Sequence, residues 1–234
     1  MSSVAHGRVA FFGGSFDPPH TGHLAVARAA RRALDLDVIL FAPVGAQPLK
    51  PLGSTAEFAD RVAMTELAVT GEPGFAVSLA DAPEPQGRPN YTIDTLLDLR
   101  DRLPEGGALF CLMGADSFLG LRRWRRGADI PFVAPLIVAS RPGEDLHDLA
   151  AVLPEGLSIA GEPAPPSNGD LRTYTLRNNA GSTTPIYLLP GLHVEVSASE
   201  IRQQVHAALG RLPSGHDLLP APVSAYIASH NLYR

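Results

Sequence analysis

The stretch from residue 9 to residue 23, VAFFGGSFDPPHTGH, decides the fold. Its first four residues are apolar and predict a short buried strand that ends at Gly13 and Gly14. An Ala- and Arg-rich stretch over 24–34 predicts the helix that follows. Glycines between a strand and a helix let the backbone approach a phosphate, and a helix start presents N–H groups to it. We therefore expect an anion-binding loop here, since ligands bind at the carboxyl ends of parallel strands.

Two histidines, His20 and His23, flank the expected helix start. Their ring N–H groups can donate hydrogen bonds to phosphate oxygens. The loop is neither the Rossmann glycine fingerprint nor a P-loop, and no Lys follows the glycines. Two alternatives stay open: a plain structural turn, and a metal-binding His pair for which the sequence offers no obvious third ligand.

The remaining chain alternates short apolar runs with amphipathic stretches, which predicts an α/β fold with a doubly wound, mostly parallel sheet covered on both faces. Ser54 and Glu57 have the spacing of a capping box ahead of a helix over 57–69. The expected strands cover 38–42, 75–79, 109–113 and 135–139, and the expected helices cover 92–103, a segment after Gly114, 199–209 and 222–229.

Domain-size priors predict one domain over 1–234, with a C-terminal helical segment over 197–234. Residues 154–185 break the alternation, because prolines and glycines gather there. We expect an irregular Pro/Gly-rich excursion in this region. It can still carry a strand pair, since 172–176 and 186–189 contain β-favouring residues.

The net charge of −5 argues against a broad electrostatic grip on duplex nucleic acid, although it leaves room for a local basic pocket. The single Cys111 allows no disulfide within the chain and no cysteine-based zinc site. No apolar run is long enough to cross a bilayer, and the first residues lack the apolar core of a signal peptide. We expect a cytoplasmic protein without nucleic-acid or membrane partners; its oligomeric state, a homo-oligomer included, stays open.

A second candidate anion site lies at 197–202, SASEIR. Ser197 and Glu200 have capping-box spacing, and an apolar helical pattern follows them. Arg202, one turn into this helix, can give forked, charge-assisted hydrogen bonds to a phosphate. The alternative is a helix cap beside a solvated arginine.

Three further residues carry candidate chemistry. Trp124, the only tryptophan, lies in the basic run LRRWRR over 121–126 and can stack on a base or pyridine ring. The alternative for Trp124 is a partly buried anchor beside a solvated basic patch. Asp116 lies at the start of an expected helix. It can cap this helix, bind a ribose, or do both. Asp17 either caps a turn or contributes to the water shell of a metal ion.

The loop motif GGSFDPPHTGH resembles the signature of the nucleotidylyltransferase superfamily, which carries a T/HxGH motif. Five further segments resemble bacterial nicotinate-nucleotide adenylyltransferases: 91–96, 114–117 with Trp124, 141–143, 197–202 and 219–233. The resemblance implies a Rossmann-like nucleotidylyltransferase fold with C-terminal helices. It also implies transfer of AMP from ATP to nicotinate mononucleotide, giving deamido-NAD and pyrophosphate in NAD biosynthesis. Mg²⁺ would come with ATP, held mainly by substrate and water rather than by a protein metal site.

The same resemblance assigns site residues by position. It makes His20, His23 and Arg202 catalytic. The residues implied at ATP and its phosphates are Gly13, Gly14, Ser15, Phe16, Lys50, Gly114, Asp116, Ser117, Ser197, Ser199 and Ile201. The residues implied at nicotinate mononucleotide are Tyr91, Thr92, Trp124 and Arg141, with Trp124 stacked on the nicotinate ring.

Two positions depart from the family pattern. Leu49-Lys50 stands where the family usually has His-Lys, and Arg125 stands where an aromatic residue is common. Three alternatives to the expected activity stay open. They are a sister transferase acting on another acceptor, such as phosphopantetheine or nicotinamide mononucleotide, a nucleotide-binding module without turnover, and a metal-dependent hydrolase that uses the His pair.

Overall fold

The structure, a computed structural model, describes residues 7–49, 53–140, 149–167, 171–189, 197–207 and 218–234. Its backbone contacts divide the chain into two compact units, each described by itself below. Unit 1 comprises Met1–Phe12, Ala27–Ile39 and Tyr91–His193, and unit 2 comprises Gly13–Val26, Leu40–Asn90 and Val194–Arg234.

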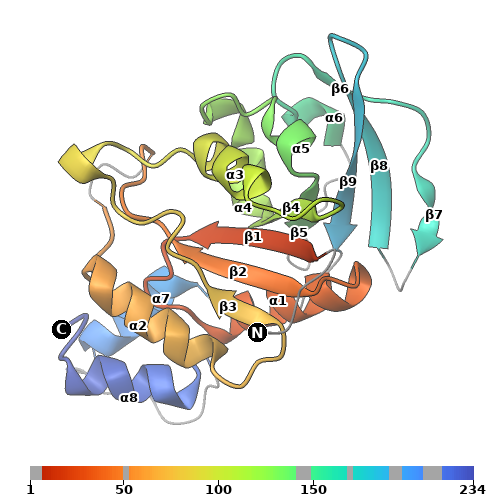
Figure 1. Cartoon of the computed structure of the whole chain (residues 1–234). Coiled ribbons are helices and arrows are strands. Elements are labelled where there is room, and N and C mark those ends of the chain that lie inside the picture. Colours follow the sequence, from red (N-terminus) through yellow and green to blue (C-terminus); the bar gives the residue numbers. More distant parts are fainter. Residues whose placement is uncertain (1–6, 50–52, 141–148, 168–170, 190–196, 208–217) are drawn as a thin grey trace. The chain divides into compact units, whose positions relative to one another are not determined.

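Parallel strands form the centre of the sheet in unit 1 (Figure 1). Strand β1 (Arg8–Gly14) pairs with β4 (Ala108–Gly114), which pairs with β5 (Leu136–Ala139), which pairs with β9 (Thr183–Leu189). All four residues of β5 are buried, as expected for a strand covered on both faces. The short apolar runs of the sequence are therefore the interior of the sheet.

The strands run in the order β3-β2-β1-β4-β5-β9-β8-β6, with β7 paired to β8. Strand β2 covers Val38–Pro43 and β3 covers Phe75–Val77. The order reverses direction between β1 and β4, which is the switch point where open α/β sheets bind ligands. This order confirms the predicted doubly wound α/β fold.

Antiparallel strands extend the sheet beyond β9, where the sequence predicts an irregular excursion over 154–185. Strand β8 (Leu171–Asn178) pairs with β9, and β6 (Leu157–Ile159) and β7 (Ala164–Ser167) pair with β8. The strand pair that the sequence left open is thus present, with Arg172 opposite Leu188. Proline is compatible with β7, because β7 pairs on one side only and an edge strand needs fewer N–H donors.

Unit 1 also contains several helices, some of which contact these strands (Figure 1). They are α3 (Thr92–Asp101), α4 (Ala115–Leu119), the 3₁₀ turn η2 (Leu121–Arg123), α5 (Ile130–Val133) and α6 (Leu149–Val152). Helix α1 (Thr21–Ala33) begins in unit 2 and continues into unit 1. The turn from β4 into α4 at Gly114 follows the sequence prediction.

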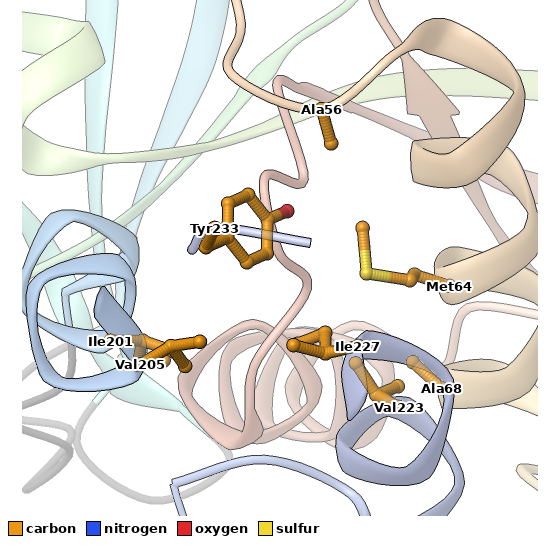
Figure 2. Packing of buried hydrophobic residues seen from close by; sticks show 8 residues of the cluster. All are labelled: Ala56, Met64, Ala68, Ile201, Val205, Val223, Ile227 and Tyr233. Carbon is orange, nitrogen blue, oxygen red and sulfur yellow. The ribbon is translucent and has the colours of Figure 1, made fainter. Parts of the chain in front are cut away.

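Unit 2 contains α2 (Phe58–Val69), the 3₁₀ turn η1 (Pro85–Gly87), α7 (Ala198–Ala207) and α8 (Ala221–Ser229). Figure 2 shows side chains of α2, α7 and α8 in one apolar cluster, which the ring of Tyr233 joins. The cluster residues are Ala56, Met64, Ala68, Ile201, Val205, Val223, Ile227 and Tyr233.

The capping box expected ahead of α2 is wrong. Glu57 is the N-cap residue of α2 and makes no side-chain capping hydrogen bond. The N–H groups of Thr55 and Ala56 instead donate to the distant carboxylate of Asp17. Among the described residues, no helix is both long and apolar enough to cross a membrane.

Candidate active site

The loop over 13–23 belongs to unit 2; it includes the last two residues of β1, the connection that follows, and the first turn of α1. Phe16 has a φ of +46°, a left-handed conformation that costs energy in a bulky residue and persists only when its surroundings hold it. Its buried ring packs 5.6 Å from the ring of Phe41 and 5.0 Å from that of His23. A Cβ on Gly14 would approach the Phe16 ring to 3.3 Å. The glycine therefore leaves room for Phe16, and Phe16 fixes the loop against His23.

The two histidines lie against each other, with ring centroids 3.7 Å apart. The main-chain N–H of His20 donates to Nδ1 of His23 at 3.1 Å. A nitrogen that accepts this bond carries no proton, so the proton of the neutral His23 ring sits on Nε2. The structure thereby makes His23 Nε2 a hydrogen-bond donor, as the phosphate-binding hypothesis requires.

The sequence predicts that the N–H groups at the start of α1 face a ligand. One of them, that of Thr21, instead has a partner within the protein. The Thr21 N–H donates to the carbonyl of Leu218 at 3.0 Å, and the Thr21 hydroxyl donates to the same oxygen. This contact fixes the helix start to the segment ahead of α8. The side chains of His20 and His23 therefore carry more of the candidate chemistry than the Thr21 amide does.

Asp17 is a buried anchor for the loop. Its Oδ2 accepts the Thr55 N–H at 2.6 Å, and its Oδ1 accepts the Ala56 N–H at 3.1 Å and the Tyr233 hydroxyl at 2.8 Å. Both carboxylate oxygens are therefore engaged by protein donors. This arrangement favours the turn-anchoring alternative for Asp17 over a place in the water shell of a metal ion.

Arg202 reaches the same loop from α7. Its Nη1 donates to the main-chain oxygen of Asp17 at 2.6 Å, and its Nη2 donates to the hydroxyl of Ser199 at 3.2 Å. Ser197 caps the helix by accepting the Glu200 N–H at 3.4 Å, which confirms the first half of the expected capping box. The guanidinium of Arg202 is thus held in place at the loop, rather than solvated at random.

Arg61 is a residue of this site that the sequence analysis missed. Its side chain is only 2% exposed, and its Nη1 donates to the carbonyl of Ser15 at 2.8 Å. Burial lowers the pKa of Arg61, and the nearby Asp17 carboxylate partly offsets this. No motif marks Arg61, because an arginine in an amphipathic helix ordinarily faces water.

The predicted site residues of unit 1 follow β4. Gly114 is the N-cap residue of α4, so the interpretation of Asp116 as the N-cap is wrong. Asp116 lies instead in the first turn of α4 and is exposed, where the helix dipole favours a carboxylate. Ser117 lies in the same turn and is half-buried.

Trp124 and Tyr91 also belong to unit 1, and both are half-buried. Trp124 follows η2, and a Cβ on Gly127 would collide with the carbonyl of Leu121, so the turn around Trp124 needs this glycine. The guanidinium of Arg125 lies 4.7 Å from the centre of the Tyr91 ring, a cation–π distance. Arg125, which stands where the family commonly has an aromatic residue, therefore contacts Tyr91. The sequence did not predict this contact.

The remaining predicted residues are placed as follows. Lys50 and Arg141 lie outside the described residues, and Leu49 is 49% exposed. The side chain of Ile201 is buried in the apolar cluster, so only its main chain is left for a ligand. Thr92 begins α3. Across the described ranges, no group of three or more His, Cys, Asp or Glu residues has the arrangement of a metal site.

Comparisons with known proteins match nearly the whole chain. The family model described as cytidylyltransferase-like matches residues 11–204. A "Probable nicotinate-nucleotide adenylyltransferase" of Citrifermentans bemidjiense is 38% identical over 97% of this chain and 98% of that protein. A protein of the same description from Laribacter hongkongensis is 40% identical over 100% of this chain and 98% of that protein.

Solved structures are similar in fold. A Plasmodium falciparum nicotinic acid mononucleotide adenylyltransferase, solved in complexes with APC and with NaAD, superposes with TM-scores of 0.67 and 0.66. Its sequence identity is 16% and 17%, with 97% of this chain and 98% of that chain covered. At this identity the likeness concerns the fold alone. Together, the family model and the full-length relatives show that this chain belongs to the cytidylyltransferase-like family and, within it, groups with the nicotinate-nucleotide adenylyltransferases.

Proposed function

We propose that this enzyme transfers AMP from ATP to nicotinate mononucleotide and forms deamido-NAD and pyrophosphate. The names of its full-length relatives support this activity, and the loop over 13–23 carries the chemistry within unit 2. The observation on which the proposal depends most is the hydrogen bond from the His20 N–H to His23 Nδ1, because it makes Nε2 of the neutral His23 ring a hydrogen-bond donor.

The reaction exchanges one phosphoanhydride bond for another. A phosphate oxygen of nicotinate mononucleotide attacks the α-phosphorus of ATP, and the bond from that phosphorus to the bridging α,β-oxygen breaks. The electron pair leaves with pyrophosphate. Because the attacking oxygen is already an anion, no general base is needed, and catalysis consists of positioning and electrostatic stabilisation.

His20 and His23 hold oxygens of the triphosphate in this proposal. His23 Nε2 donates to an oxygen of the α-phosphate, where charge develops in the transition state, and so acts as an oxyanion-hole donor does. The neighbouring Phe16 ring and the His20 main chain keep the His23 ring in place. The histidine therefore needs no reorganisation when the bond breaks.

Arg202 holds the β- and γ-phosphates that leave. Its guanidinium carries a full positive charge and is already oriented by Asp17 and Ser199. Mg²⁺ accompanies ATP and neutralises charge on the phosphates. The ion would be held by phosphate oxygens and water; the Asp17 carboxylate is already engaged by protein donors.

Residues of unit 1 recognise the nucleotides. The indole of Trp124 offers a flat surface on which the nicotinate ring stacks. Tyr91, Thr92 and Arg141 bind the same mononucleotide, while Gly114, Asp116 and Ser117 bind ATP. Gly114 suits a close approach, since a Cβ there would meet no described residue other than its chain neighbours within 4 Å.

An isotope experiment tests this activity. The enzyme is incubated with nicotinate mononucleotide and Mg²⁺, and with ATP labelled either at the α- or at the γ-phosphorus. We expect the α-label in a dinucleotide and the γ-label in pyrophosphate. Release of labelled inorganic phosphate, or ATP binding without any dinucleotide, would contradict the proposal and favour a hydrolase or a binding module.

A further inference from the structure

Tyr233 joins the apolar cluster of unit 2 to the phosphate-binding loop. Its side chain is only 8% exposed, and its ring lies among residues of α2, α7 and α8 (Figure 2). Its hydroxyl leaves the cluster and donates to Asp17 Oδ1 at 2.8 Å, across 216 residues of sequence. A single side chain thus contacts both the core of unit 2 and the loop.

Asp17 also contacts Arg202. The Asp17 main-chain oxygen accepts the Arg202 Nη1–H at 2.6 Å, while the closest distance from that nitrogen to the Asp17 carboxylate is 3.9 Å. The arginine therefore bonds to the neutral carbonyl of Asp17 rather than closely to its charged oxygens. The carboxylate itself is turned toward Thr55, Ala56 and the Tyr233 hydroxyl.

The loss of the hydroxyl would change this balance. Asp17 Oδ1 would then keep only the Ala56 N–H of these two donors, and a buried carboxylate oxygen with fewer donors is less well stabilised. Arg202 Nη1 lies 3.9 Å from Asp17 Oδ2, so a small turn of the carboxylate would bring the two charges into closer contact. A close Asp17–Arg202 ion pair would neutralise the group that is proposed to hold the departing phosphates.

We propose that Tyr233 is a positioning residue for phosphate binding: its hydroxyl holds the Asp17 carboxylate away from Arg202, so that the arginine keeps its charge for ATP. The proposal rests on the proposed function for the identity of the ligand. Ile201, the neighbour of Arg202 on α7, shares the apolar cluster with Tyr233. The helix that carries Arg202 and the ring of Tyr233 therefore belong to the same apolar cluster.

Two further properties of Tyr233 agree with this role. Its φ of +61° is a left-handed conformation, which a bulky residue adopts only where its contacts hold it. Burial raises the pKa of the Tyr233 hydroxyl well above its ordinary value, and the Asp17 carboxylate adds to this effect. The hydroxyl therefore stays a donor throughout the neutral and mildly alkaline range.

Tyr226 provides a matched control in the same unit. Its hydroxyl also donates to a carboxylate, Asp60 Oδ1, at 2.9 Å, but Asp60 lies on α2 and not in the loop. Tyr233→Phe and Tyr226→Phe each keep the aromatic ring and remove one hydroxyl. A general loss of stability would affect both variants, whereas a loss of phosphate binding should affect only the first.

Calorimetric binding of Mg²⁺–ATP without acceptor measures the effect. We expect Tyr233→Phe to raise the Kd on the order of tenfold, and Tyr226→Phe to leave it unchanged. In an Arg202→Ala background, Tyr233→Phe should add nothing, because both changes act on the same guanidinium. Equal effects of the two tyrosine variants, or independent effects of Tyr233→Phe and Arg202→Ala, would overturn the proposal.

A second measurement covers the case in which Tyr233→Phe does not fold. Site-specific 3-fluorotyrosine at position 233 or 226 keeps the hydroxyl, and its ¹⁹F resonance reports on the surroundings. We expect ATP to shift the resonance at 233 and not that at 226; the absence of a shift at 233 would overturn the proposal. ATP binding without dinucleotide formation would contradict the proposed function alone, whereas a wild type that binds no ATP would overturn both.

Discussion

At the scale of single residues, the proton of His23 has a defined position. The His20 N–H occupies Nδ1, so the neutral ring presents Nε2–H, and the edge contact with Phe16 keeps the ring from turning. The sequence predicted both histidines but not the tautomer, because a tautomer depends on which group faces each nitrogen. The position of this proton makes the role of His23 testable.

His23→Ala should lower kcat on the order of 10²–10³-fold, as the loss of an oxyanion-hole donor does. His23→Gln, whose amide extends about as far as Nε2, should recover part of this loss. His206→Ala, on an exposed histidine of α7, is the control. Steady-state kinetics and thermal unfolding measure the effect, and near-wild-type turnover in folded His23→Ala would exclude the proposed role.

At the scale of elements, local patterns predicted the central strands, α2, α3 and the capped start of α7. They failed where a contact spans the sequence. The carboxylate of Asp17 replaces the expected capping box from 38 residues away, and Arg61 binds the Ser15 carbonyl from 46 residues away. Capping and periodicity report on neighbours within about one helical turn. Contacts such as these exist only once the chain has folded.

The segment that carries Trp124 gives a prediction at the same scale. Trp124→Ala should raise the KM for nicotinate mononucleotide on the order of tenfold, because the acceptor ring loses its stacking surface. The Kd of ATP should not change. Arg122→Ala, at an exposed position of η2, is the matched control. An unchanged acceptor KM in Trp124→Ala would contradict the assignment.

At the scale of the whole molecule, an acidic chain carries local positive charge where the proposed chemistry needs it. The net charge is −5, yet Arg61 and Arg202 both donate to main-chain oxygens of the loop over 13–23. The sequence indicated Arg202 through its helix cap and gave no sign of Arg61. Local charge of this kind suits one nucleotide rather than a polyanion.

The stability of the whole molecule should depend on Tyr233 at alkaline pH. The pKa of Tyr233 is raised in the folded state, so its contribution is complete below the unfolded value of about 10 and is lost as the pH rises above it. For each pH unit above about 10, the free energy of unfolding of the wild type should fall by about 1.4 kcal/mol relative to that of Tyr233→Phe. Unfolding in urea between pH 8 and pH 11 measures this difference, and parallel curves for the two proteins would refute it.

The central claim is that the phosphate-binding loop serves the transfer of AMP to nicotinate mononucleotide. Its most direct test is pyrophosphate release at fixed Mg²⁺–ATP with nicotinate mononucleotide, nicotinamide mononucleotide and phosphopantetheine as separate acceptors. We predict the highest kcat/KM for nicotinate mononucleotide. A higher kcat/KM for either of the other acceptors, or no release with any of them, would contradict the claim.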